Sequence, residues 1–206
     1  MSDAACFIFG AGPFYGLVEA PGPGDRILAA DGGYRHCLAA GLEPDLLLGD
    51  FDSLDALPPH LEAKKYPVEK DDTDTMLAIK LGLELGHRRF HLYGGTGGRM
   101  DHTLANLQAL AYLAQAGARG DLYGEGCVFT AIQNSHLILP ARPSGVFSVF
   151  CLGPEARGVT IRGGQYPLTQ APLSPFFPLG VSNHFQGEPV EITVEEGCLL
   201  ICRELP

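Results

Sequence analysis

Residues 89–115 read RFHLYGGTGGRMDHTLANLQALAYLAQ, which places a short apolar run, a glycine-rich turn and a helical pattern in succession. The run over 89–94 has the length and composition of a buried strand. Apolar side chains then recur three and four residues apart, which predicts a helix over 103–115 that stops at Gly117. The side chains expected to turn inward are Leu104, Leu107, Leu110 and Ala111. A strand that passes through glycines into a helix is typical of a βαβ unit.

The rest of the first half repeats this alternation of apolar runs and helical patterns. Leu77, Leu81 and Leu85 recur every four residues and predict a second helix, which Thr73 or Asp72 can cap. The strands predicted in this half cover residues 6–10, 26–30, 46–49, 65–68 and 89–94. Alternating strands and helices predict a mostly parallel sheet, and such sheets bind their ligands at the carboxyl ends of the strands.

The second half follows a different pattern. After about residue 120 the helical periodicity ends, and short apolar runs follow, separated by Gly and Pro. These runs are CVFTAIQ, SHLILP, GVFSVFCL, GVTIRG, VEITV and CLLICRE. They predict an antiparallel sandwich or barrel, and residues 163–180 are expected to form a long connecting loop. We therefore expect an α/β domain over 1–120 and an all-β domain over 121–206.

Composition narrows the classes of function. A net charge of −10 and a pI near 5.0 argue against nucleic acid or an anionic membrane surface as the main partner. A small-molecule partner fits better, and an acidic protein that handles ATP needs divalent cations between its carboxylates and the phosphates. The six cysteines lack metal-ligand spacing and are expected to be buried thiols. The absence of a signal-like start and of a long apolar run predicts a cytoplasmic protein.

Two acidic clusters directly follow predicted strands. Asp31-Gly32-Gly33 closes the strand over 26–30, where its glycines allow a ligand to approach the backbone, although a plain turn is an equal explanation. The segment 49–53, GDFDS, closes the next strand. Alternate residues of an extended segment point the same way, so Asp50 and Asp52 can present two carboxylates to one Mg²⁺ ion. The other interpretation of this segment is a turn that caps the next helix.

Two further clusters lie where a strand passes into a helix. In the segment 70–74, KDDTD, one carboxylate is expected to cap the helix, and the others exceed what a cap requires. The segment 94–102, GGTGGRMDH, has four glycines that let backbone N–H groups converge on an anion, and Arg99 adds positive charge. It lacks the Gly-Lys-Ser/Thr ending of a P-loop. Gly10-Ala11-Gly12 is interpreted as a structural turn and His102 as a local hydrogen-bonding residue.

The motifs DGG, GDFDS, KDxTD and GGxGGRxDH, followed by Gly180-Val181-Ser182-Asn183, occur in this order between residues 31 and 183. Taken together they closely resemble the thiamine pyrophosphokinase family. The resemblance implies a Rossmann-like α/β domain followed by an antiparallel β-sandwich. It also implies a reaction in which the diphosphate of ATP passes to the hydroxyl of thiamine, with Mg²⁺ as cofactor and AMP as the second product.

The resemblance also assigns roles to matching residues. It implies metal ligands at Asp50, Asp52 and Asp74. The catalytic residues that it implies are Asp52, Asp71, Asp74, Arg99 and Asp101. Phosphate and nucleotide binding is expected at Asp31, Gly32, Gly95, Gly97, Gly98 and Arg99. Ser182 and Asn183 match the segment that contacts the thiamine pyrimidine, and because family members are homodimers with interfacial sites, these two can serve the partner's acidic cluster.

Some features leave alternatives open. The chain has no Trp to stack on the thiamine ring, so Phe185 is the candidate for that role, and the base is Asp71 or Asp74. A diphosphokinase acting on a pterin alcohol would keep the acidic and glycine clusters without needing Ser182 and Asn183. A Mg²⁺-dependent phosphohydrolase would use Asp50 and Asp52, but the downstream lysine motif is missing. A non-enzymatic binding regulator would need fewer carboxylates.

Overall fold

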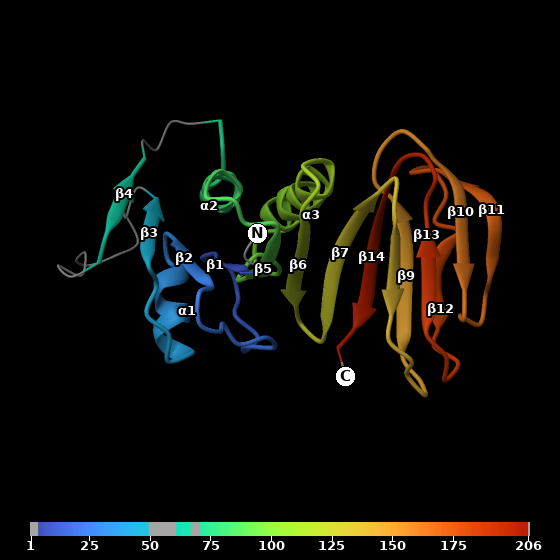
Figure 1. Cartoon of the computed structure of the whole chain (residues 1–206), viewed down its shortest axis with the longest axis horizontal. Helices are drawn as coiled ribbons and strands as arrows, with labels where there is room; N and C mark the ends of the chain where they lie inside the picture. The colour runs from blue at the N-terminus through green and yellow to red at the C-terminus, as the bar shows by residue number, and fades with distance from the viewer. Residues whose placement is uncertain (1–3, 50–60, 67–70, 206) are drawn as a thin grey trace. The chain divides into compact units, whose positions relative to one another are not determined.

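The computed structural model describes residues 4–49, 61–66 and 71–205, which form two compact units. The first unit covers Met1–Ala109 and Gly120–Glu125, and the second covers Leu110–Arg119 and Gly126–Pro206. Figure 1 shows helices in the first unit and long antiparallel strands in the second. None of the described helices has the length and apolar composition that a membrane span requires.

The first unit is built on the strand run β6-β5-β1-β2-β3-β4. Its strands are β1 (Cys6–Phe9), β2 (Arg26–Ala30), β3 (Leu46–Gly49), β4 (Ala63–Lys65), β5 (Arg89–Tyr93) and β6 (Arg119–Gly124). Every pairing from β5 through β4 is parallel, which confirms the predicted sheet. β4 lies earlier than the strand predicted over 65–68, of which 67 and 68 fall outside the described residues. β6 was not among the predicted strands.

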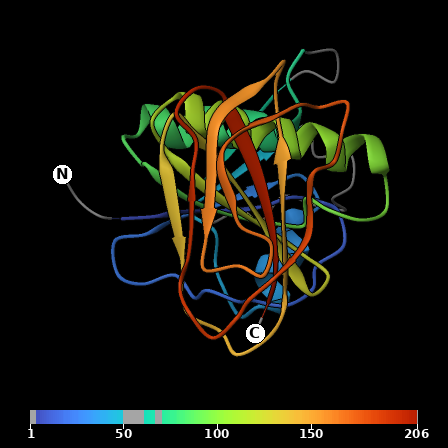
Figure 2. The ribbon, with the colours of Figure 1, turned by 90° about the vertical axis from the view of Figure 1, so that its right-hand side faces the viewer.

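Three helices accompany this sheet: α1 (Gly33–Ala39), α2 (Asp74–Glu84) and α3 (Met100–Gln115). Figures 1 and 2 show α1 and α2 on opposite faces of the strands. α3 begins three residues before its predicted start, and Gly117, at φ 68°, follows its end as predicted. The prediction that Leu104 turns inward is wrong, because its side chain is 57% exposed. Asn106, about 200° further round the helix, is buried instead.

A column of stacked rings supports the end of β5. The ring of His91 stacks on Phe7 at 4.5 Å between centroids, and Tyr93 stacks on Tyr123 at the same distance. His91 Nδ1 and the Tyr123 hydroxyl form a hydrogen bond of 2.8 Å. Burial lowers the pKa of His91 and so favours the neutral ring. These contacts join β1, β5 and β6 and fix the strand end from which the glycine-rich turn departs.

The second unit contains the antiparallel strand run β12-β9-β14-β7 and a separate four-stranded antiparallel sheet of order β11-β10-β13-β8. Its strands are β7 (Cys127–Gln133), β8 (His136–Leu139), β9 (Val146–Cys151), β10 (Ala156–Arg162), β11 (Leu168–Leu173), β12 (Gly180–His184), β13 (Val190–Thr193) and β14 (Cys198–Glu204). Residues from both sheets share one apolar core, including Phe147, Val159, Ile192 and Leu199. The predicted change to antiparallel β structure is confirmed.

The prediction of a continuous loop over 163–180 is wrong, because β11 lies within it. β11 pairs only with β10 among the described strands, and the pairing is interrupted by register shifts. An edge strand tolerates Pro172, since the missing N–H leaves no ladder partner unpaired. The proline and glycine content of this segment therefore led to the prediction of a loop where an edge strand forms.

Candidate active site

Two glycine turns lie side by side where β1 and β5 end. The Gly10 N–H donates to the Tyr93 carbonyl, and the Gly12 N–H donates to the Gly94 carbonyl, each at 2.8 Å. A Cβ on Gly94 would lie 2.2 Å from the Gly10 oxygen, and a Cβ on Gly12 would lie 2.7 Å from the Gly94 oxygen. Gly94 also has φ 63°. The two turns can approach this closely only because glycine occupies these positions.

A cavity of about 420 Å³ opens beside these turns, within the range of small-molecule sites. Its walls come from the turn after β1, the start of α2, the turn after β5 and the first turns of α3. The lining residues are Ala11, Gly12, Pro13, Thr75, Gly94, Gly95, Gly97, Gly98, Arg99, His102 and Asn106. The segment 10–12 thus shapes a cavity as well as packing the sheet. His102 reaches the same cavity, and its role stays open.

Asn106 ties the glycine-rich turn to α3. Its Nδ2 donates to the Gly95 carbonyl at 2.8 Å, and the side chain is buried. A Cβ on Gly95 would lie 2.7 Å from Leu122 Cδ1, so the turn is held closely from β6 as well. Thr75 and Asn106 line the cavity but were not predicted as site residues. Asn106 lies four residues before Leu110, which was predicted to turn inward, and this spacing to a polar residue is a signal that could have been used.

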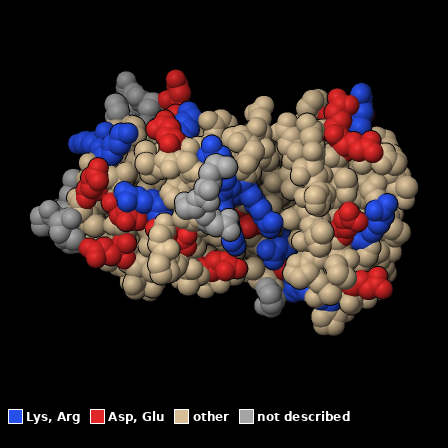
Figure 3. Space-filling view, viewed as in Figure 1, with Lys and Arg blue, Asp and Glu red and all other residues tan. Residues whose placement is uncertain are grey.

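Arg99 and Asp101 form an exposed ion pair at the mouth of the cavity. Arg99 Nη2 and Asp101 Oδ2 are 2.6 Å apart, and Nε donates to Oδ1 at 3.2 Å. The hydrogen bonds from Arg99 lower the pKa of Asp101. Both side chains remain largely exposed, so the pair orients the guanidinium while leaving it accessible to an anion. Figure 3 shows acidic and basic side chains mixed on the face drawn there.

The start of α2 is capped by Thr73, one of the two predicted caps, and not by a carboxylate of the segment 70–74. Thr73 Oγ1 accepts a hydrogen bond from the Met76 N–H at 3.2 Å. Asp72 instead binds Lys80 Nζ through both oxygens, at 2.6 and 2.7 Å. Asp71 is exposed before the helix, and Asp74 is its first residue. Two carboxylates predicted to act in the site thus flank the helix start from which Thr75 reaches the cavity.

Asp31 and Gly32 lie in the turn between β2 and α1. Asp31 has φ 49°, an uncommon conformation for a residue with a side chain. Its N–H donates to the Leu48 carbonyl at 2.7 Å. A Cβ on Gly49 would come within 3.3 Å of Asp31 Cβ, so the end of β2 lies against the end of β3. Gly32 is the cap residue of α1.

Asp50 and Asp52 lie outside the described residues. Within the described ranges, no group of three His, Cys, Asp or Glu side chains is arranged to hold a metal. Asp31, Asp71 and Asp74 carry hard oxygen donors of the kind that suits Mg²⁺.

The C-terminal pair, Ser182 and Asn183, lies on β12 in the second unit. Ser182 is exposed with φ 59°, and its N–H donates to Ser148 Oγ at 3.1 Å. The side chain of Asn183 is 3% exposed. Asn183 Oδ1 accepts from the N–H groups of Tyr166 and His184, both at 2.9 Å, and Nδ2 donates to the Tyr166 carbonyl at 2.7 Å. The amide expected to contact thiamine is thus engaged with the protein backbone.

Phe185 does not suit the stacking role predicted for it. Its side chain is 3% exposed and packs on Phe147, with ring centroids 5.1 Å apart. The guanidinium of Arg142 lies 5.1 Å from the centroid of the Phe185 ring. A ring that belongs to the apolar core offers no open face to a ligand.

Two sequence models match the chain in the regions just described. One, described as thiamin pyrophosphokinase, catalytic domain, matches residues 24–119. The other, described as thiamin pyrophosphokinase, vitamin B1 binding domain, matches residues 135–199. The chain belongs to the thiamine pyrophosphokinase family. The first match contains most of the cavity lining, and the second contains Ser182 and Asn183.

Individual relatives agree with this assignment. The thiamine pyrophosphokinase of Bacillus subtilis is 37% identical over 91 residues, so the match spans 40% of this chain and 42% of that protein. Its crystal structure has the same fold, with a TM-score of 0.89, 24% identity and coverage of 97% of this chain and 98% of that chain. The thiamin pyrophosphokinase structure from Geobacillus thermodenitrificans gives a TM-score of 0.84, 26% identity and 98% coverage of both chains. A thiamin pyrophosphokinase family protein from Enterococcus faecalis gives 0.83, 28% identity and 98% and 99% coverage.

Proposed function

We propose that this protein is a Mg²⁺-dependent thiamine diphosphokinase, which transfers the terminal diphosphate of ATP to the primary hydroxyl of thiamine and releases AMP. The observation that carries the proposal is the cavity of about 420 Å³ lined by glycine backbone, Arg99 and the start of α3. Backbone N–H groups at a helix start and a guanidinium together suit the phosphates of a nucleotide. The match to a vitamin B1 binding domain supports thiamine over a pterin alcohol, and over simple hydrolysis.

The two halves of the chain take different substrates in this proposal. Residues 1–120 form a Rossmann-like domain that binds ATP and metal, and residues 121–206 form a β-sandwich that binds thiamine. The separate family matches support this division. Two further features remain predictions. One is a homodimer whose subunits share the substrate sites, and the other is a cytoplasmic location.

The reaction transfers a diphosphoryl group by forming one P–O bond and breaking another. A bond forms between the thiamine hydroxyl oxygen and the β-phosphorus, and the bond from the β-phosphorus to the oxygen bridging to the α-phosphorus breaks, so that this oxygen leaves with AMP. The hydroxyl proton passes to Asp71 or Asp74, near the start of α2. Arg99 and the N–H groups of the glycine turn hold the phosphates and neutralise oxygen charge. Mg²⁺, bound by Asp50, Asp52 and Asp74, would supply further neutralisation.

Product analysis tests the reaction. We expect purified protein incubated with thiamine, ATP and Mg²⁺ to form AMP and thiamine diphosphate in equal amounts, measured by chromatography and mass spectrometry. ADP with thiamine monophosphate would contradict diphosphate transfer, and inorganic phosphate alone would indicate a phosphohydrolase. The Arg99→Ala protein, prepared in the same way, controls for contaminating kinases.

Metal removal tests the role of the acidic residues. The protein carries a net charge of −10, and carboxylates near the strand ends repel a triphosphate unless a cation lies between them. We therefore expect excess EDTA to lower the rate by about 100-fold or more, and added Mg²⁺ to restore it. Activity that persists in EDTA would show that Arg99 and the backbone suffice without metal.

A further inference from the structure

Residues 12–19, the β1 loop, follow β1 and are fixed to the first unit at both ends. The Gly12 carbonyl accepts a hydrogen bond from His36 Nε2 at 2.7 Å. At the other end, the Glu19 N–H donates to the Tyr93 hydroxyl at 3.0 Å, and that hydroxyl donates to the Glu19 carbonyl at 3.1 Å. The β1 loop therefore has little conformational freedom, although much of it is exposed.

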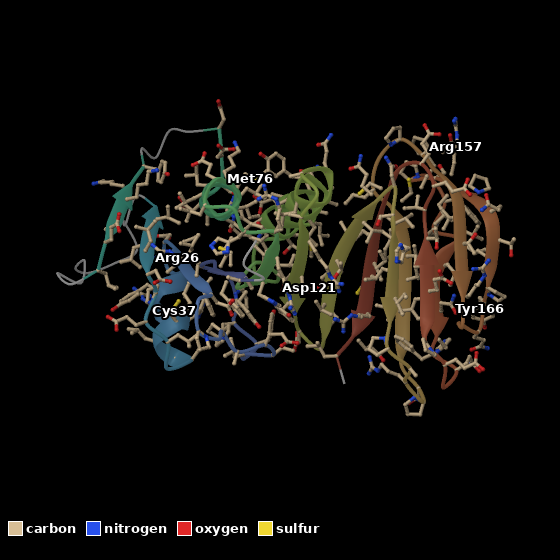
Figure 4. The ribbon with its side chains drawn as sticks, in the orientation of Figure 1. Arg26, Cys37, Met76, Asp121, Arg157 and Tyr166 are labelled. Atoms are coloured by element: carbon tan, nitrogen blue, oxygen red, sulfur yellow. The ribbon has the colours of Figure 1, made fainter. Side chains whose placement is uncertain are left out.

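Phe14 anchors the middle of the β1 loop. Its ring stacks on His36, with centroids 5.3 Å apart and an interplanar angle of 24°. It also meets Phe9 at 6.1 Å and Tyr93 at 6.0 Å between centroids. His36 belongs to α1, next to the buried Cys37 that Figure 4 labels on that helix. Rings from β1, α1 and β5 thus hold the loop against the sheet.

Pro13 and Tyr15, on either side of Phe14, lie against the glycine-rich turn. A Cβ on Gly97 would collide with the Tyr15 hydroxyl oxygen and would lie 3.2 Å from Pro13 Cγ. A Cβ on Gly98 would lie 3.5 Å from Pro13 Cδ. Pro13 and both glycines line the cavity. The hydroxyl end of Tyr15 therefore rests on backbone that forms the cavity wall.

A glycine-rich turn needs such support, because glycine backbone can adopt many conformations. N–H groups bind an anion best when they already converge, since ordering them during binding costs free energy. Asn106 holds the start of the turn through the Gly95 carbonyl. Around the Cβ position of Gly97, the nearest atoms belong to Pro13 and Tyr15. The β1 loop thus supports the part of the turn that lies beyond the contact with Asn106.

We propose that Tyr15 is a positioning residue for the nucleotide, which keeps Gly97 in the conformation that binds phosphate. This inference rests on the proposed function, because it takes the cavity to be the ATP site. The lining of the cavity includes Gly97 but not Tyr15, so Tyr15 acts on the ligand through the turn. Its loss should lower affinity for the nucleotide and leave thiamine recognition as it is.

Calorimetry on the full-length protein, with a nonhydrolysable ATP analogue and Mg²⁺, tests the proposal. We expect Tyr15→Ala to weaken nucleotide binding about tenfold, because the freed turn must be ordered again during binding. Tyr15→Phe should bind within about threefold of wild type, since its ring still covers the turn. Thiamine affinity, measured with the analogue present, should stay within about twofold in both variants. Tyr112→Ala is the matched control, because Tyr112 is an exposed tyrosine of α3 outside the cavity lining.

Gly97→Ala and Gly98→Ala examine the contact itself. Both place a side chain at positive φ, 76° and 57°, but the added Cβ collides with Tyr15 only at position 97. We expect Tyr15→Ala to cost little further affinity in the Gly97→Ala protein, because the added methyl group already displaces the ring. In the Gly98→Ala protein, Tyr15→Ala should still cost about tenfold. Equal further losses in the two glycine variants would contradict a role for the contact.

Three other outcomes are decisive. Wild-type nucleotide affinity in Tyr15→Ala, with binding intact in the wild type, would overturn the role of Tyr15 and leave the proposed function standing. Equal losses in Tyr15→Ala and Tyr15→Phe would mean that the hydroxyl bonds to the ligand, and would overturn the positioning role. If wild type bound no nucleotide and formed no thiamine diphosphate, the proposed function would itself fail. Melting temperatures and the thiamine affinities check that each variant is folded.

Discussion

Replacing Gly94 by alanine is expected to lower the free energy of unfolding by about 3 to 5 kcal/mol. The added Cβ would lie 2.2 Å from the Gly10 oxygen, and the residue would be held at φ 63°. The clash and the backbone strain add, because the turn after β1 cannot withdraw without breaking the hydrogen bond from Gly12 to Gly94. Thermal unfolding followed by circular dichroism would measure the loss.

Gly117→Ala is the matched control for this substitution. Gly117 has φ 68°, close to that of Gly94, but a Cβ there would meet nothing within 4 Å. We expect a loss of only about 1 kcal/mol from strain alone. Equal losses at the two positions would contradict the importance of close contact between the glycine turns. Nucleotide analogues should stabilise Gly117→Ala as they do wild type, and should fail to stabilise Gly94→Ala.

Arg99→Ala is expected to lower kcat by about 100-fold to 1000-fold, because a donor aimed at developing oxygen charge acts mainly in the transition state. Arg99 lines the cavity, and its guanidinium is oriented by Asp101. Arg99→Lys keeps the charge but loses the paired donors, so a partial loss is expected. Steady-state kinetics with varied ATP would separate kcat from KM.

Arg157→Ala controls for the loss of an exposed ion pair. Arg157 Nε lies 2.7 Å from Glu155 Oε2, two residues away, and the side chain is exposed to a similar extent. It lies in the second unit, far along the chain from the glycine turns. We expect kcat to stay within twofold of wild type. A similar fall in kcat for both variants would mean that Arg99 acts through general stability or charge and not through phosphate contact.

The sequence predicted the ends of β1, β2, β3 and β5 well because parallel strands buried on both faces appear as unbroken apolar runs. Cys6–Phe9 and Leu46–Gly49 are buried throughout. The glycine-rich segment 94–98 was predictable for a related reason, since positive φ angles and close backbone contacts demand glycine. Which second segment would meet it was not predictable. That Gly10 and Gly12 contact Gly94 depends on the strand order, which the local sequence does not encode.

The direction of side chains was predicted less well than the ends of the strands. Leu104 was expected inside and is exposed, because the first turns of α3 bury Asn106 against the glycine-rich turn. Asn183 lies on β12 and Phe185 follows the end of that strand, and both side chains are buried. An apolar core accepts the phenyl ring, and the neighbouring loop satisfies the amide. The sequence pattern around Asn183 and Phe185 does not indicate which side chains face a ligand.

The hydrogen bond from Gly12 to Gly94 joins residues that are about 80 positions apart in the chain. The cavity proposed to bind nucleotide therefore cannot exist until β5 has been synthesised and has paired with β1, and no local fragment contains it. During translation, the first 90 or so residues would emerge without a binding site for ATP. Nucleotide in the cell would act late, by stabilising molecules whose parallel sheet is already complete, and would offer no help to the nascent chain.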